Sequence, residues 1–93
     1  MKPLVRGSLV RLRSGYAGYT CIVISEDLTS PNDYFQLRYN GVYKDVDPSA
    51  VITVLEEKTF ENIWTSNGVA TYVKVALNTG QVGWIARRNL SIL

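Results

Sequence analysis

Short runs of alternating apolar and polar residues, each closed by a turn-forming residue, constrain the fold of this chain most. In residues 8–13, Val10 and Leu12 alternate with Arg11 and Arg13, and Gly15 follows two positions later. Successive side chains of a strand point to opposite faces, so such a run buries one face and exposes the other. No stretch keeps apolar residues at helical spacing for three turns, and β-branched and aromatic residues are abundant. The sequence therefore predicts an all-β fold.

The predicted strands are short and are separated by turns rich in glycine, proline and asparagine. They cover residues 8–13, 20–25, 34–40, 42–46, 52–56, 61–65, 71–78, 81–86 and 91–93. Asn40-Gly41 and Asn78-Thr79-Gly80 tolerate positive φ and predict tight hairpins. A pattern of strand, hairpin, strand, one-turn connector and strand spans residues 34–55 and recurs over residues 72–93. We therefore expect two copies of one unit and no helix longer than two turns.

Eight apolar residues that are in phase with these strands are expected to form the core. They are Val10, Leu12, Ile22, Ile24, Leu37, Val54, Val75 and Ile85. Cys21 opens an apolar run and is assigned to the core as well, because free cysteine is among the most buried residue types. With one cysteine and no histidine, the chain can form no internal disulfide, no Cys/His zinc site and no histidine-dependent catalytic triad.

The length of 93 residues fits one compact domain, or two very small modules that share a core. Hydrophobic residues make up 46% of the chain and charged residues 19%, which is a globular balance. No apolar run approaches the roughly 18 residues of a membrane span, and no apolar segment follows the first residues. The sequence therefore predicts a cytoplasmic protein with no membrane partner.

Two groups of short motifs resemble small barrels of known families. Residues 52–56, 72–75 and 79–85, with Leu90, are similar to the second half of a bacterial SH3 domain, although Tyr72 stands where that family has a tryptophan. Residues 7–15, with Gly18 and residues 22–24, resemble the opening of KOW and other SH3-like barrels.

The resemblance implies an SH3-like barrel architecture in two tandem small modules that pack together. The first is an SH3-like, KOW-like module over residues 1–56, and the second covers residues 57–93. Residues 58–68 offer no clear counterpart of a first strand and its long loop. The second module is therefore expected to be incomplete and to lean on the first.

The acidic residues form no convincing catalytic group. The pairs at 26–27 and 56–57 are adjacent in sequence, so on strands they face opposite ways. Asp45 and Asp47 share a face, but without further ligands this favours a solvated strand end over a cation site. Residues 15–18 lack the Lys-Ser or Lys-Thr ending of a phosphate loop. We predict no enzyme, no cofactor and no metal site.

Charge is distributed unevenly along the chain. Residues 1–25 and 62–93 hold basic residues and no acid, whereas residues 26–61 hold all 8 acids. The first and last strands of an SH3-like module are neighbours, so the two ends would form one basic face that attracts phosphates. The competing interpretation is an ordinary solvated surface. The predicted face comprises Arg6, Arg11, Arg13, Lys74, Arg87 and Arg88.

Two binding functions follow from these features. The first is a protein partner held in an SH3-like groove, where Trp84, Tyr16 and Tyr19 would grip a peptide. The alternative is KOW-like binding of nucleic acid or a ribonucleoprotein on the basic face, where the two tyrosines would stack bases. A tryptophan after glycine also packs against a barrel, and tyrosines also cap one. The predicted binding residues are Arg11, Arg13, Tyr16, Tyr19, Arg38, Lys74, Trp84, Arg87 and Arg88.

Overall fold

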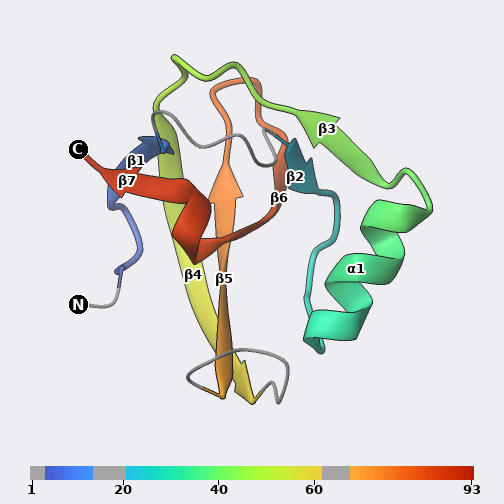
Figure 1. Ribbon diagram of the computed structural model, residues 1–93. Helices are drawn as coiled ribbons and strands as arrows, with labels where there is room; N and C mark the ends of the chain where they lie inside the picture. Colours follow the sequence, from blue (N-terminus) through green and yellow to red (C-terminus); the bar gives the residue numbers. More distant parts are fainter. Residues whose placement is uncertain (1–3, 14–20, 62–67) are drawn as a thin grey trace.

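In the described part of the chain, seven strands form one antiparallel sheet in the order β3-β2-β6-β5-β4-β1-β7 (Figure 1). The computed structural model describes residues 4–13, 21–61 and 68–93. The strands are β1 (Leu9–Leu12), β2 (Cys21–Val23), β3 (Tyr43–Asp45), β4 (Ile52–Glu61), β5 (Val69–Ala76), β6 (Val82–Ala86) and β7 (Leu90–Ile92). The sheet is curled, and the all-β class predicted from the sequence is confirmed. This half-closed sheet is compatible with an SH3-like fold.

Strands from the two ends of the chain lie side by side in this sheet. β1 pairs with β7, with Leu12 opposite Leu90, and β1 also pairs with β4. β2 pairs with β6 through Val23 and Trp84. The boundary between modules at residues 56 and 57 stays a prediction; β4 runs through it as one strand, with a shift of register between Val54 and Glu56.

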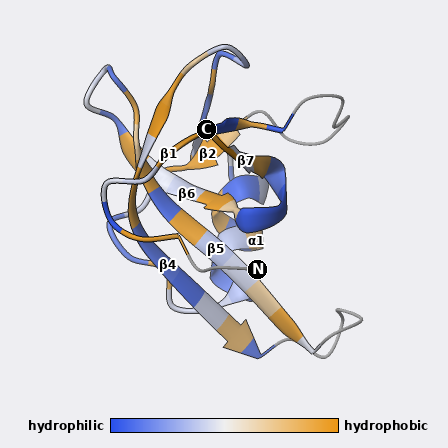
Figure 2. Ribbon diagram, turned by 90° about the vertical axis from the view of Figure 1, so that its left-hand side faces the viewer, coloured by the Kyte–Doolittle hydropathy of each residue, from blue (hydrophilic) through white to orange (hydrophobic). Residues whose placement is uncertain are grey.

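The core consists of two clusters on opposite faces of the sheet. Side chains of β4 and β5 alternate between these faces, and Figure 2 shows the alternation as bands of hydropathy along the strands. The larger cluster includes Val10, Leu12, Ile22, Ile52, Val54, Val73, Val75, Ile85 and Leu90. The smaller comprises Val23, Leu28, Tyr34, Tyr72 and Trp84. Six of the eight predicted core residues are buried, while Ile24 and Leu37 are half-buried at the margins.

A helix, α1 (Pro31–Tyr39), replaces the strand that the sequence predicted over residues 34–40. Ser30 caps its first turn, because the hydroxyl accepts the Asp33 N–H at 3.1 Å. Pro31 follows at the first helical position, where its missing N–H costs nothing. These end signals outweigh the strand preference of the aromatic residues within the segment. At nine residues, α1 has about two and a half turns, so the expectation of none longer than two was wrong.

The Asn40-Gly41 pair ends α1 and does not form a hairpin. The Val42 N–H bonds the Leu37 carbonyl at 2.9 Å, and the Gly41 N–H bonds the Arg38 carbonyl at 3.1 Å. Gly41 has a φ of 78°, so this is a Schellman end that needs glycine. The predicted match of residues 34–55 to 72–93 is therefore wrong.

The hairpin predicted at residues 78–80 is confirmed. Leu77 donates its N–H to the Gln81 carbonyl at 2.9 Å, and β5 and β6 continue on either side. Residues 52–56 and 61, expected on two separate strands, lie on the single strand β4, and residues 62–65 lie outside the described part of the chain. No helix among the described residues is long and apolar enough to cross a membrane.

Candidate functional site

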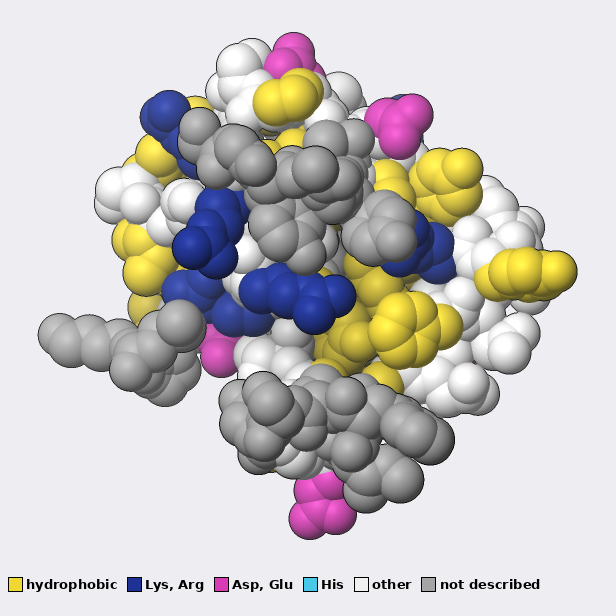
Figure 3. Space-filling model, in the orientation of Figure 1, with side chains coloured by type: hydrophobic (Ala, Val, Ile, Leu, Met, Phe, Trp, Pro, Cys, Tyr) yellow, Lys and Arg dark blue, Asp and Glu magenta, His cyan; other side chains and the backbone are white. Residues whose placement is uncertain are grey.

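Arginines from both ends of the chain meet on one side of the molecule. Arg11 lies opposite Ser91 of β7, and Arg13 donates its backbone N–H to the carbonyl of Asn89 at 2.8 Å. Asn89 ends the 3₁₀ helix η1 (Arg87–Asn89). Because Val10 and Leu12 point into the core, Arg11 between them points outward. Figure 3 shows Lys and Arg side chains gathered over β1, β7 and η1, and we term Arg11, Arg13, Arg87 and Arg88 the basic face.

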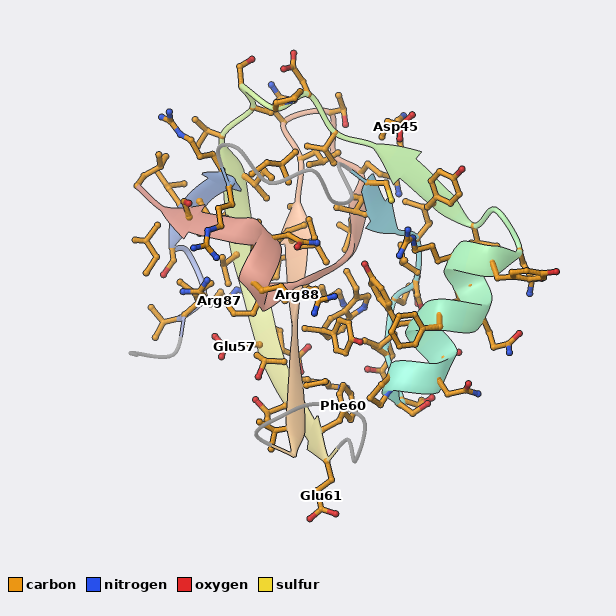
Figure 4. All side chains as sticks on the ribbon, in the orientation of Figure 1. Asp45, Glu57, Phe60, Glu61, Arg87 and Arg88 are labelled. Carbon is orange, nitrogen blue, oxygen red and sulfur yellow. The ribbon has the colours of Figure 1, made fainter. Side chains whose placement is uncertain are left out.

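The two arginines of η1 differ in exposure. Arg88 is exposed, whereas Arg87 is half-buried and donates from one terminal guanidinium nitrogen to the Leu90 carbonyl at 3.2 Å. Figure 4 places Glu57 below Arg87, while Asp45 and Glu61 lie far from it. Glu57 also accepts the N–H of Leu4 at 2.6 Å. Among the described residues, none of the four arginines of the basic face forms an ion pair with an acid.

Two predicted basic residues lie away from this face. Lys74 donates its ammonium to the carbonyl of Glu26 at 2.7 Å, in the loop before α1. Arg38 lies on α1, near the Cys21 thiol. Burial raises the pKa of that thiol, and the charge of Arg38 opposes the shift. Tyr16 and Tyr19, which the sequence assigned to the binding surface, lie outside the described residues.

Trp84 is fully buried, at 0% exposure, so its ring is not open to a partner. It belongs to the smaller core cluster, and the ammonium of Lys58 lies 5.6 Å from the ring centroid. The sequence offers two interpretations of this residue, packing against the barrel and gripping a peptide, and the structure supports packing. Its assignment as a binding residue is wrong, because a small domain gains more by burying so large a ring.

Gly83 lies on β6 next to the position where Val23 of β2 pairs with Trp84. A Cβ at this position would stand 2.6 Å from the carbonyl oxygen of Val23 and 2.9 Å from the Cδ1 atom of Ile22. Real Cβ contacts are essentially never this short, so only glycine fits here. The two residues of the Gly83-Trp84 dipeptide therefore have different roles in β6. The glycine leaves room for Ile22 and Val23 of β2, and the tryptophan fills the smaller core cluster.

Two lysines form hydrogen bonds to the loop that leads into α1. Lys58 of β4 bonds the carboxylate of Asp27, and Lys74 of β5 bonds the neighbouring Glu26 carbonyl. The hydrogen bond from Lys58 lowers the pKa of Asp27, and the same contact raises the pKa of Lys58. These contacts hold α1 over the smaller core cluster.

Four aromatic rings form a continuous row from β4 to α1. The centroids of Phe60 and Tyr72 are 6.2 Å apart, those of Tyr72 and Tyr34 are 4.6 Å apart, and those of Tyr34 and Phe35 are 5.7 Å apart. The inner two rings are buried, whereas Phe60 is half-buried and Phe35 is 50% exposed. We term Phe60, Tyr72, Tyr34 and Phe35 the aromatic row.

The aromatic row was missed by the sequence analysis because residues 34–40 were assigned to a strand. The Ser30-Pro31 helix start was the signal that could have placed Tyr34 and Phe35 on a helix. Burial raises the pKa of Tyr34 to about 12, so its phenol stays neutral. Burial also raises the pKa of Tyr72, and the nearby charge of Arg88 opposes the shift. The row therefore borders the basic face at Arg88.

No three His, Cys, Asp or Glu side chains gather to hold a metal ion in residues 4–13, 21–61 and 68–93. The chemistry that the described residues offer is cationic and aromatic. Such groups recognise anions and ring systems.

The family model of the GW (Gly-Tryp) dipeptide domain matches the chain twice, over residues 7–43 and over residues 49–91. The first segment contains β1, β2 and α1, and the second contains β4, β5 and β6. Only the second contains a Gly-Trp dipeptide, at residues 83–84. Comparisons with the curated proteins and with the solved structures give no significant match.

Proposed function

Because the chain belongs to the family of GW (Gly-Tryp) dipeptide domains, we propose that it is a small non-enzymatic binding module whose partner is a polyanion bound on the basic face. Domains of this family generally mediate binding. The observation that carries the proposal is the pairing of β1 with β7, since the strand that holds Arg11 runs beside the segment that follows Arg87 and Arg88. The partner class that we favour is nucleic acid.

The reason for a polyanion lies in the chemistry of clustered guanidinium groups. Each guanidinium is a planar fork that matches two phosphate oxygens and remains charged at any physiological pH. Each phosphate that it neutralises releases condensed counterions, which drives binding of a chain of phosphates. A cytoplasmic location, which the sequence predicts, forms part of this proposal because it gives access to nucleic acid.

A protein partner is the second candidate, and the surface that favours it is not the predicted groove. Apolar side chains are exposed around the C-terminal end of α1 and the start of β3, namely Tyr39, Val42 and Tyr43. Exposed apolar patches often mark protein contacts. This patch lies on α1 and at β3, an edge of the sheet, whereas the basic face lies at β1 and β7 toward the other edge.

The salt dependence of oligonucleotide binding tests the proposal. Four phosphate contacts with a single strand predict a log-log slope of about −3, with a Kd of roughly 10⁻⁴ to 10⁻⁶ M at physiological salt. Arg11→Ser should remove one contact and flatten the slope by about 0.7. Lys44→Ser is the matched control, because it removes one charge from β3 at the opposite edge of the sheet.

Two outcomes would contradict the proposal. One is that the protein binds neither single-stranded nor duplex oligonucleotides at low salt. The other is that Lys44→Ser flattens the slope as much as Arg11→Ser does, since binding would then follow net charge and not this face. A protein partner whose binding ignores salt and is lost in Tyr39→Ala would favour the second candidate.

A further inference from the structure

A hydrophobic area lies directly beside the basic face, on the same side of the molecule. Figure 3 shows it between the clustered Lys and Arg side chains and α1. In Figure 4, Arg88 extends from η1 toward the centre of this side, and Phe60 lies below it. Arg88 is also close enough to Tyr72 for its charge to act on the phenol. The basic face and the aromatic row are therefore neighbours at Arg88.

The two ends of the aromatic row are its accessible parts. Tyr72 and Tyr34 are buried at 4% and 3% exposure, and their ring centroids lie 4.6 Å apart with the ring planes tilted by 37°. They support Phe60 on one side and Phe35 on the other, and both of these rings reach the surface. Rings held by packed neighbours lose little conformational entropy when a ligand stacks on them.

We propose that this side of the molecule binds single-stranded nucleic acid, with phosphates on the basic face and unstacked bases on Phe60 and Phe35. Every base has a π-face, so stacking on aromatic side chains adds affinity for any sequence. A duplex cannot use these rings, because its bases are already stacked within the helix. The inference rests on the proposed function, since the arginines must first hold the phosphates.

Binding of two strands that differ only in their bases tests this inference. The probes are a fluorescent oligothymidylate and an abasic strand of the same length, which carries the same phosphates and sugars. The protein should bind oligothymidylate at least about fivefold more tightly, because one stacked base contributes that much or more. Phe35→Leu and Phe60→Leu should each reduce this preference and leave binding of the abasic strand unchanged.

Tyr39→Leu is the matched control, because this ring is 89% exposed on the same helix and takes no part in the aromatic row. It should leave both affinities unchanged. Should Phe60→Leu lower the melting temperature, Phe35→Leu decides the question, since the half-exposed ring of Phe35 is not part of the core.

The possible failures of the inference and of the proposed function are distinguishable. Equal affinity of the parent protein for both strands would overturn base stacking and leave polyanion binding intact. An equal loss of preference in Tyr39→Leu and Phe35→Leu would also overturn the inference. Absence of binding to either strand at low salt would remove the proposed function, and the inference with it.

Discussion

Replacing Gly83 by alanine tests how closely β2 lies against β6 at this glycine. The new methyl group would stand 2.6 Å from the carbonyl oxygen of Val23, and 2.9 Å and 3.1 Å from two atoms of Ile22. Gly83 does not have positive φ, so the substitution adds no backbone strain of its own. The backbone oxygen cannot move aside unless β2 separates from β6, where Val23 pairs with Trp84.

The expected cost of Gly83→Ala can be estimated from two opposing effects. Overpacking a rigid site costs about 1 to 3 kcal/mol, and the upper part of this range applies because the clash is with backbone. Replacing glycine also restricts the unfolded chain, which returns up to about 1 kcal/mol. The net loss of about 2 kcal/mol corresponds to a fall in Tm of roughly 8 to 16 °C for a domain of this size.

Thermal unfolding followed by circular dichroism measures the effect of Gly83→Ala. The double variant with Ile22→Val removes the Cδ1 atom but leaves the Val23 carbonyl in place, so it should recover less than half of the loss. A Tm for Gly83→Ala within about 2 °C of the parent would refute the reasoning. It would mean that β2 does not approach β6 at this glycine.

The remaining predictions concern the core, the pH dependence and the end of α1. In urea unfolding, Ile85→Ala should lower the free energy of unfolding by about 2 to 5 kcal/mol and Leu37→Ala by clearly less, because Ile85 is fully buried and Leu37 is half-buried. Equal losses would contradict the core assignment. Burial raises the pKa of Tyr34 from 10.0 to about 12, so the unfolded chain loses the phenol proton at a lower pH than the folded protein does. The free energy of unfolding should therefore fall by on the order of 2 to 3 kcal/mol as the pH rises through this interval. Urea unfolding of Tyr34→Phe from pH 9 to roughly 12 should lack this part of the loss, and identical profiles for the two proteins would refute it. Gly41→Ala should lower stability by about 1 kcal/mol and Gly41→Asn by less, because asparagine tolerates positive φ; thermal unfolding with Gly41→Ala at the parent Tm would contradict the assigned end of α1.

The parts of the fold that the sequence predicted were those that depend on local alternation. Val10 and Leu12 alternate with arginines, and this pattern identified both the strand and its buried face. The adjacency of the first and last strands followed from the SH3-like resemblance, and Arg11 lies opposite Ser91 of β7. These features are predictable because the pairing register of β1 is fixed: a shift by one residue would expose its whole apolar face.

The parts that the sequence analysis missed depend on competition between signals. Residues 34–40 have a strand-like composition, but the Ser30 cap and the glycine end of α1 decide the outcome. The sequence predicts a strand that ends at Glu56, whereas β4 continues to Glu61 and pairs with β5 along this extension. Burial of Trp84 could not be deduced from alternation alone, because both faces of β6 are covered.

The aromatic row and the position of Lys74 depend on contacts between elements that are far apart in the sequence. Tyr72 and Tyr34 come from β5 and α1, which are far apart in sequence, and their contact exists only once α1 lies over the sheet. Lys74 was grouped with the basic face because of its charge, yet its strand directs it toward the loop before α1. Charge counts along the chain identified the arginines of the ends but not the direction of this side chain.

An NMR titration of the labelled protein with a single-stranded oligonucleotide tests the central claim most directly, because it reports where the strand binds. We expect salt-sensitive shifts of the backbone amides of residues 11–13 and 87–91, where β1, η1 and β7 meet. The amides of β3, at the opposite edge of the sheet, should stay unchanged. Shifts confined to α1 and β3, or no shifts at low salt, would contradict the assignment of the basic face as the binding surface.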